Sequence, residues 1–203
     1  MSVDLESIYK KRRDDILDPV SRRLLQFLMD CFSAEPRIDR ITTRAKTISS
    51  FIVKAGKKEN GVVVYGDPLN QIQDQIGARI IVFYKSDVER IAGVVNNYFR
   101  SIEEKSIVPE RDEEFGYFGR HFVLFLPTDV LVDVDEVDEP PKFFELQIKT
   151  LYQHAWSEAN HDLGYKESVT LTSDEKRKVA FTAAQSWGAD TIFDELFKNK
   201  TRH

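Results

Sequence analysis

The chain has 203 residues, of which 41% are hydrophobic and 31% are charged, and its formal net charge is −5 at pH 7. This length allows one substantial core, so we expect one domain with helical extensions. The acidic balance argues against a general nucleic-acid binder, and since the sequence has no signal-like or membrane-length apolar run, we expect a cytoplasmic protein without a membrane partner.

Residues 1–36 are predicted to form an N-terminal helical extension with one break. Asp18 precedes Pro19 in the pattern of a helix N-cap and first helical position, so a second helix is expected to start there. Cys31 follows Leu28 and Met29 in an apolar run, and we expect it to be buried. As the single cysteine, it can form no internal disulfide.

Residues 37–166 are predicted to form a mixed α/β domain. The expected strands are residues 37–44, 76–84, 102–108, 121–127 and 143–149, of which 76–84 is the most apolar run and so a central strand. Helices are expected at residues 44–54 and 86–100 and after residue 150. Residues 167–203 are predicted to add a C-terminal helix packed on the same domain.

The strand at residues 143–149 has an unusual polar face. Phe144, Leu146 and Ile148 alternate with polar residues, so the two sets point to opposite faces. Charged groups on a strand otherwise suited to burial are costly unless that face is wet or occupied by a ligand. We therefore expect a functional site on the face that carries Glu145, Gln147 and Lys149.

Asp74 lies just before the central strand, and Arg79 lies within it. If adjacent strands bring Asp74 close to Glu145, the two carboxylates would serve as an acid–base pair or as ligands for a hard cation such as Mg²⁺. The basic residues nearby in this layout would suit a polyphosphate substrate. Two surface carboxylates with ordinary ion pairs, and a helix with a solvated basic face, would give the same pattern, so the residues alone leave both interpretations open.

Five pieces of the chain, in their order and spacing, resemble the synthetase domain of the RelA/SpoT family of (p)ppGpp synthetases. They are RAKTISSFIVK (44–54), DQIGARI (74–80), FGYFGRH (115–121), ELQIKT (145–150) and QHAWSEANHDLGYK (153–166). Each piece is weak alone, but the combination over residues 40–166 is specific. The resemblance implies a nucleotidyltransferase-like mixed β-sheet flanked by helices. It also implies Mg²⁺-dependent transfer of the β,γ-pyrophosphate of ATP to the 3′-hydroxyl of GDP or GTP.

The resemblance further implies a role for each matching residue on the ATP side. Arg44 and Arg79 would hold the adenine, and Lys46, Ser50 and Lys54 would hold the phosphates. Pyrophosphoryl transfer needs positioning and charge neutralisation more than covalent chemistry, which agrees with this allocation.

The remaining matches concern the metal and the acceptor. Asp74 and Glu145 would hold Mg²⁺, and Glu145 would also activate the acceptor hydroxyl. Tyr117 would stack on the guanine, but stacking does not select guanine over adenine, and the sequence does not locate the hydrogen bonds that would. The other residues expected on the acceptor side are His121, Gln147 and Lys149.

The acceptor loop departs from the family pattern. Members usually place a basic residue shortly before the Gly-Tyr pair and a serine two residues after the tyrosine, where this chain has Glu113, Glu114 and Gly119. Acidic residues would repel acceptor phosphates unless Arg111 or Arg120 compensates.

Two alternatives therefore stay open. One is a toxin-like relative that pyrophosphorylates an adenine nucleotide or a tRNA 3′ end. A tRNA acceptor would require a stripe of basic residues outside the pocket, and the acidic net charge argues against one. The other is a non-catalytic nucleotide-binding module, which would not need the activating carboxylate. The leading expectation remains an enzyme with ATP and guanine-nucleotide substrates, assembled as a homo-oligomer.

Overall fold

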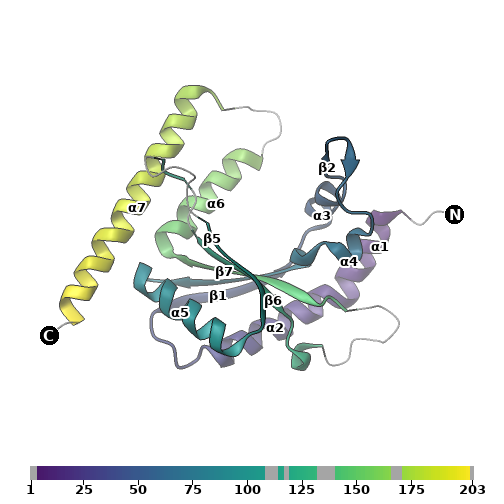
Figure 1. Ribbon diagram of the computed structural model, residues 1–203, viewed down its shortest axis with the longest axis horizontal. Helices are drawn as coiled ribbons and strands as arrows, with labels where there is room; N and C mark the ends of the chain where they lie inside the picture. Colours follow the sequence, from purple (N-terminus) through teal and green to yellow (C-terminus); the bar gives the residue numbers. More distant parts are fainter. Residues whose placement is uncertain (1–3, 108–113, 117–118, 132–139, 166–170, 202–203) are drawn as a thin grey trace.

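The computed structural model describes residues 4–107, 114–116, 119–131, 140–165 and 171–201. Within this part of the chain, five strands form one mixed sheet in the order β1-β4-β7-β6-β5 (Figure 1). β4 and β7 are parallel, and the other neighbouring pairs are antiparallel. The strands are β1 (Ile38–Ala45), β4 (Ile76–Val82), β5 (Ser101–Ile107), β6 (Gly119–Phe125) and β7 (Phe143–Thr150).

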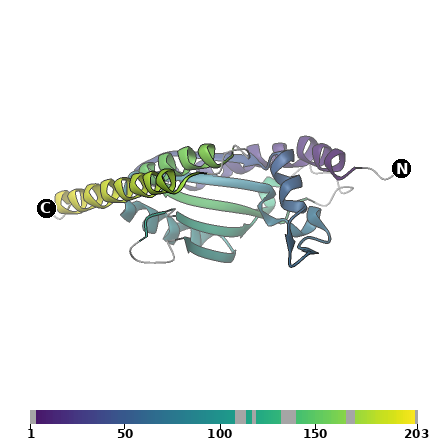
Figure 2. The same cartoon turned by 90° about the horizontal axis from the view of Figure 1, so that it is seen from above.

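Helices cover both faces of this sheet, as predicted. α2 (Asp18–Cys31) and α5 (Lys85–Tyr98) lie on one face, and α6 (Leu151–Tyr165) and α7 (Ser173–Thr201) lie on the other (Figure 1). Figure 2 shows that the two chain ends lie at opposite ends of the molecule. The architecture confirms the predicted fold class, whereas the proposed boundaries at residues 36 and 166 stay a prediction.

The smaller elements lie between β1 and β4. α3 (Ile48–Ala55) is followed by a hairpin of β2 (Lys58–Glu59) and β3 (Val62–Val63). Asn60 and Gly61 form its tip with φ values of 51° and 81°, the left-handed conformation that tight hairpin turns require. Next come α4 (Pro68–Gln71) and 3₁₀ turns at Gln73–Gln75 and, later in the chain, Thr128–Val130.

The N-terminal helix is continuous, so the predicted break at Asp18 is wrong. α1 (Leu5–Arg12) passes through a π-helical turn (Arg13–Leu17) into α2, and Asp18 itself is helical with φ −67° and ψ −44°. The π-turn ends at Leu17, two residues before Pro19, whose missing backbone donor would otherwise disturb a regular helix. The continuous helix keeps the apolar residues on one buried stripe, namely Leu17, Val20, Leu24 and Leu28.

The predicted burial of Cys31 is also wrong. Cys31 is exposed, because Phe32 rather than Cys31 continues the buried stripe beyond Leu28. The rest of the core lies between the sheet and helices α2 and α5. Its centre is the apolar face of β7, where Phe144, Leu146 and Ile148 are fully buried, as the alternation predicted.

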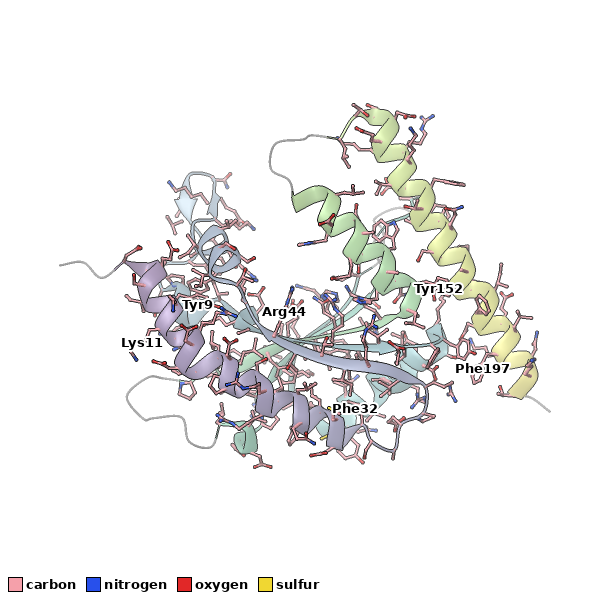
Figure 3. The ribbon with its side chains drawn as sticks, turned by 180° about the vertical axis from the view of Figure 1, so that it is seen from behind. Tyr9, Lys11, Phe32, Arg44, Tyr152 and Phe197 are labelled. Carbon is pink, nitrogen blue, oxygen red and sulfur yellow. The ribbon has the colours of Figure 1, made fainter. Side chains whose placement is uncertain are left out.

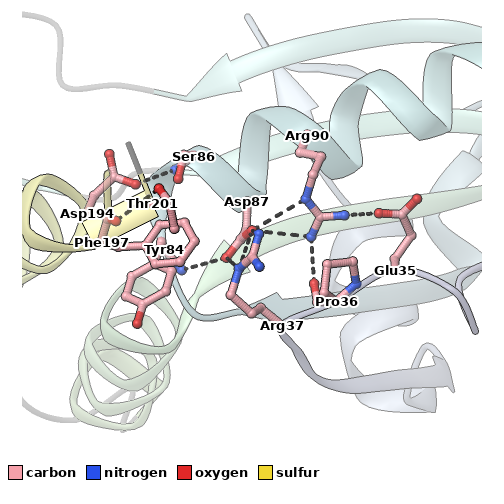
Figure 4. A network of polar contacts seen from close by, with 10 residues as sticks. All are labelled: Glu35, Pro36, Arg37, Tyr84, Ser86, Asp87, Arg90, Asp194, Phe197 and Thr201. Carbon is pink, nitrogen blue, oxygen red and sulfur yellow. Dashed lines mark hydrogen bonds and ion pairs between the residues drawn. The ribbon is translucent and has the colours of Figure 1, made fainter. Parts of the chain in front are cut away.

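A polar network joins three segments at one end of the sheet (Figure 4). Asp87, which is 1% exposed, accepts hydrogen bonds from Arg37 and Arg90. The neighbouring Ser86 donates its backbone N–H to Asp194 of α7 at 2.8 Å. These contacts fix the start of α5 against both the α2–β1 connection and α7. None of the described helices is long and apolar enough to cross a membrane.

Candidate active site

The sheet register brings the predicted polar residues onto one face. Arg44 of β1 lies opposite Gly77 of β4, which lies opposite Glu145 of β7. Residues opposite one another on neighbouring strands share a face. Gly77 carries no side chain, and a Cβ added there would meet nothing within 4 Å. An open space therefore separates the Arg44 and Glu145 positions.

The next row along the strands adds three more polar side chains. Arg79 of β4 lies opposite Gln147 of β7, and Gln147 lies opposite His121 of β6. The donor-side residue Arg79 and the acceptor-side residues Gln147 and His121 thus form one line across the sheet. Residues separated by up to 68 positions in the sequence (Arg79 and Gln147) meet here only because β4, β7 and β6 are neighbours, and a strand order could not be read from the sequence.

A cavity of about 490 Å³ lies over this face, between α3 and α6. Figure 3 shows Arg44 on the sheet between these two helices. We call this space the central cavity. Its lining includes seven of the predicted site residues: Arg44, Lys46, Ser50, Asp74, Arg79, Glu145 and Gln147. The lining does not include Lys54, His121 and Lys149, but each of them contacts another residue of the site or of α6.

Asp74 is held by two lysines from the β1–α3 segment. Its Oδ2 atom lies 2.8 Å from Lys46 Nζ and 3.0 Å from Lys54 Nζ. Burial opposes ionisation of this carboxyl, but the hydrogen bonds and positive charges of the lysines outweigh it, so the pKa of Asp74 is lowered. Asp74 Oδ1 is buried and has no hydrogen-bond partner among the described residues. Asp74 is therefore an ionised carboxylate with one oxygen available to a ligand.

Glu145 is oriented by His121. His121 Nδ1 lies 2.9 Å from Glu145 Oε1, and the glutamate side chain is 27% exposed. Burial again opposes ionisation, but hydrogen bonds from His121 and Gln147 and the charge of His121 lower the pKa of Glu145. The nearby negative charge of Asp74 acts in the opposite direction. Glu145 is thus ready to accept a proton or a cation at neutral pH.

Arg79 has the partner that a charged residue in a central strand requires. Its Nη1 atom donates to Glu158 Oε1 at 2.8 Å and lies 3.2 Å from His154 Nδ1. Both partners are on α6, one helical turn apart, so this helix orients the guanidinium over the sheet. Glu158 is a site residue that the sequence reasoning missed, although its spacing from His154 places the two on one helix face.

Lys149 is the most deeply placed cation of the site. It is 3% exposed, and its Nζ donates to Ser157 of α6 at 3.2 Å. Burial, reinforced by the positive charge of Arg79, lowers its pKa to about 8. Tyr117, the predicted stacking residue, and Glu113 lie outside the described residues.

The first turn of α3 faces the central cavity. Thr47 caps this helix by accepting a hydrogen bond from the Ser50 backbone N–H at 3.3 Å, and both residues line the cavity. A capped helix N-terminus with hydroxyl groups suits an anionic group. The sequence reasoning included Ser50 but missed Thr47, whose position before an apolar helix was the available signal. The other polar lining residues that it did not assign are Thr42, Thr43, His161 and Asp162.

The donor set fits a hard divalent cation bound together with phosphates. Asp74 and Glu145 supply ionised oxygen ligands, and Asp74 Oδ1 is unpartnered. Within the described part of the chain, no group of three or more His, Cys, Asp or Glu side chains could form a complete protein cage. Mg²⁺ characteristically uses one or two carboxylates and takes its other ligands from water and substrate phosphates.

Residues 43–170 match the family described as "Region found in RelA / SpoT proteins". The chain belongs to this family. It is 27% identical over 167 residues to "GTP pyrophosphokinase YjbM" of Bacillus subtilis, an alignment that covers 78% of this chain and 72% of that protein. The resemblance on which the sequence reasoning relied is confirmed.

Solved structures show the same fold. The structure of a GTP pyrophosphokinase family protein from Streptococcus pneumoniae aligns with a TM-score of 0.77 and 22% identity, covering 98% of this chain and 97% of that one. Small alarmone synthetase 1 of Bacillus subtilis, bound to its product pppGpp, aligns with a TM-score of 0.71 and 21% identity, covering 88% and 91% of the two chains. The fold thus extends beyond the matched family region to include α7.

Proposed function

We propose that this RelA/SpoT-family enzyme transfers the β,γ-pyrophosphate of ATP to the 3′-hydroxyl of GDP or GTP in a Mg²⁺-dependent reaction. Family membership and the GTP pyrophosphokinase relative support (p)ppGpp synthesis as the general activity. The observation that carries the proposal is one cavity in which two ionised carboxylates, Asp74 and Glu145, lie among Arg44, Lys46 and Arg79. A polyphosphate and its metal need this combination of charges.

The donor side would work by neutralising and positioning ATP. Lys46 and Lys54 are already directed at the Asp74 carboxylate, so a metal-bound phosphate at that carboxylate would find both ammonium groups within reach. Asp74 and Glu145 would hold Mg²⁺, which when bound neutralises charge that develops on the phosphate oxygens. Arg44 and Arg79 would contact the adenine from β1 and β4.

Glu145 would accept the proton of the acceptor hydroxyl. Its lowered pKa keeps it in the proton-accepting form at neutral pH, and the contact with His121 fixes its direction. A weak base is adequate, because the transition state of phosphoryl transfer is loose and depends more on in-line positioning than on a strong nucleophile. Tyr117 would stack on the acceptor base, and Gln147 and Lys149 would line the acceptor side.

The acidic residues before Tyr117 favour an acceptor with fewer phosphates. If Glu113 and Glu114 line the acceptor path, they repel a triphosphate more than a diphosphate. We therefore expect GDP to be used better than GTP, and Tyr117→Ala to lose the acceptor while it retains ATP.

The test is transfer from ATP labelled in the β,γ-pyrophosphate, with Mg²⁺, to each acceptor separately: GMP, GDP, GTP, the adenine nucleotides and bulk tRNA. Label on the guanine nucleotides supports the proposal, and Glu145→Gln should lower the rate by about 10²–10⁴ while ATP binding is retained. Label found only on tRNA or adenine nucleotides would favour the toxin-like alternative. No transfer to any acceptor would favour a binding module.

A further inference from the structure

Tyr9 of α1 connects the N-terminal helix to the ATP side of the central cavity. Its side chain is fully buried, and its ring stacks on that of Phe51 of α3, with the ring centroids 3.6 Å apart and the planes at 1°. Its hydroxyl donates a hydrogen bond to the backbone carbonyl of Lys46 at 3.1 Å. Figure 3 shows Tyr9 on the side of α1 that faces the sheet. One side chain of α1 thus contacts both α3 and the segment that leads into it.

The backbone of Lys46 lies where β1 stops pairing with β4. The last paired residues are Ala45 and Ile76. The Lys46 N–H still donates to the Gln75 carbonyl at 2.8 Å, as it would in a continuing antiparallel ladder. The Lys46 carbonyl accepts from the Tyr9 hydroxyl. The backbone of Lys46 is therefore held from two sides, by the sheet segment before β4 and by α1.

The same residue carries an ammonium group that we propose to bind the phosphates of ATP. Lys46 Nζ lies 2.8 Å from Asp74 Oδ2, its side chain is 19% exposed, and it lines the central cavity. A lysine ammonium sits on a flexible four-carbon stem, so its position depends on how firmly the backbone at the start of the stem is fixed. Precise placement of charged groups around a reacting phosphate is the main catalytic requirement of this kind of transfer.

A second contact from α1 reaches the neighbour of Asp74. Arg12, three residues after Tyr9, donates from Nε to Gln75 Oε1 at 3.1 Å, and residues three apart share a helix face. Gln75 is 3% exposed, and its side-chain nitrogen donates to two backbone carbonyls of the preceding turn at 2.7 and 2.9 Å. One face of α1 therefore contacts both segments that bring Lys46 and Asp74 together.

We propose that Tyr9 is a positioning residue for ATP, because its hydroxyl fixes the backbone of Lys46 and so presents the Lys46 ammonium to Asp74 and to the phosphates. This inference rests on the proposed function. The described lining of the central cavity does not include Tyr9, so Tyr9 acts through Lys46 and not by touching the substrate. Tyr9 also lies outside the matched family region, residues 43–170, so family membership assigns it no role.

The hydroxyl of Tyr9 can act only as a donor to this carbonyl. A backbone carbonyl accepts hydrogen bonds and cannot donate them, so the contact requires the protonated phenol. Burial raises the pKa of Tyr9 above its usual value, which keeps the proton on the hydroxyl throughout the neutral range. The contact is therefore present at any pH suited to the assay.

An ordinary core position is the competing explanation. A buried tyrosine hydroxyl needs a partner wherever it lies, and its removal would then lower the stability of the fold and leave binding unchanged. Arg23 of α2 provides a matched control. Its Nε donates to the backbone carbonyl of Val130 at 2.8 Å, and neither residue lines the central cavity. Arg23→Met thus removes an anchor of the same kind from the same continuous helix without changing a contact of Lys46.

The experiment measures the affinity for a non-hydrolysable ATP analogue with Mg²⁺ and, separately, for GDP by calorimetric titration. The proteins are wild type, Tyr9→Phe, Arg23→Met, Lys46→Ala and the double variant of Tyr9 and Lys46. Tyr9→Phe keeps the ring stacked on Phe51 and removes only the hydroxyl, so the variant should fold. Its affinity for the ATP analogue should fall about 3- to 10-fold, the range of one neutral hydrogen bond, with unchanged affinity for GDP.

The double variant tests whether Tyr9 acts through Lys46. With the ammonium already removed by Lys46→Ala, loss of the Tyr9 hydroxyl should lower the affinity for the ATP analogue by less than about 2-fold, because two residues that act through one contact are not additive. Arg23→Met should bind the analogue as wild type does, even if its thermal stability falls further than that of Tyr9→Phe.

Three results would overturn the proposal. Tyr9→Phe could bind the ATP analogue as tightly as wild type, or it could lose the same factor of affinity with and without Lys46. It could also lose affinity for GDP by as much as for the analogue, which would indicate general loosening of the fold. In each of these cases, transfer from ATP to GDP by wild type would leave the proposed function intact. Failure of wild type to bind the ATP analogue would refute the proposed function at its ATP side, and the positioning role with it.

Discussion

Replacing Lys46 with alanine removes one of the two ammonium groups that converge on Asp74. Lys46 Nζ lies 2.8 Å from Asp74 Oδ2, its side chain is 19% exposed, and it lines the central cavity. A charge-assisted contact of this kind contributes about 1.5–3 kcal/mol, and each 1.4 kcal/mol is a factor of about ten in affinity. The affinity for ATP with Mg²⁺ should therefore fall by about 10- to 100-fold.

Lys54→Ala should have a smaller effect. Its Nζ lies 3.0 Å from the same oxygen, but its side chain is 34% exposed, so solvent screens the interaction more strongly. Because both lysines contact one carboxylate, the two effects should not be additive: the loss of affinity in the double variant should differ from the sum of the single losses, as is usual for groups in one network.

The assay is calorimetric titration with a non-hydrolysable ATP analogue in the presence of Mg²⁺. Lys57→Ala is the control, because Lys57 pairs with Glu59 at 2.9 Å outside the central cavity and its side chain is 56% exposed. Unchanged affinity in both Lys46→Ala and Lys54→Ala would refute the donor site and leave α3 with only a solvated basic face.

Three further changes test other parts of the molecule. His121→Ala removes the hydrogen bond and the charge that lower the pKa of Glu145, while burial still raises it, so this pKa should rise. The acidic limb of the kcat/KM–pH profile should then move to higher pH. An unmoved limb would mean that Glu145 is not the base. Gly77→Ala should retain the thermal stability of wild type, because the added methyl meets nothing within 4 Å, yet lower activity by filling the space beside Glu145; full activity would show that substrate does not use that space. Burial raises the pKa of Asp190 to about 6, so its ionised form destabilises the fold above that pH, and this cost disappears as the pH falls from about 6 to 4. Asp190→Asn should therefore stabilise the protein relative to wild type at pH 8 by on the order of 1–3 kcal/mol. The stabilisation should be smaller at pH 4.5, and urea unfolding at the two pH values measures it.

Local patterns in the sequence were enough to predict the elements. The strict alternation of residues 143–149 predicted a strand with one buried and one polar face, and Phe144, Leu146 and Ile148 are indeed fully buried. The alternation succeeds because side chains on a strand point to opposite faces with a fixed period of two. Two local predictions were wrong for the same reason. The Asp18-Pro19 signal and the apolar neighbours of Cys31 were outweighed by packing of α2 on the sheet, which requires one continuous stripe.

The membership of the site was also available from the sequence, but only by resemblance to a family. Composition and charge pattern could not separate Lys46 and Lys54 from an ordinary solvated helix face. The structure adds the contact that distinguishes them, since both ammonium groups converge on the Asp74 carboxylate. A helical charge pattern states which residues share a face, but it does not state what that face meets.

Only the tertiary structure decided what lies across the sheet and at its end. The order β1-β4-β7-β6-β5 places Arg44, Glu145 and His121 together, and no local pattern encodes strand order because it depends on which buried faces fit one another. Asp190 is the clearest case. In the sequence it is one of many charged residues on a long helix, and its burial to 2% exposure arises only because α7 packs its carboxylate against Thr150 at the end of β7.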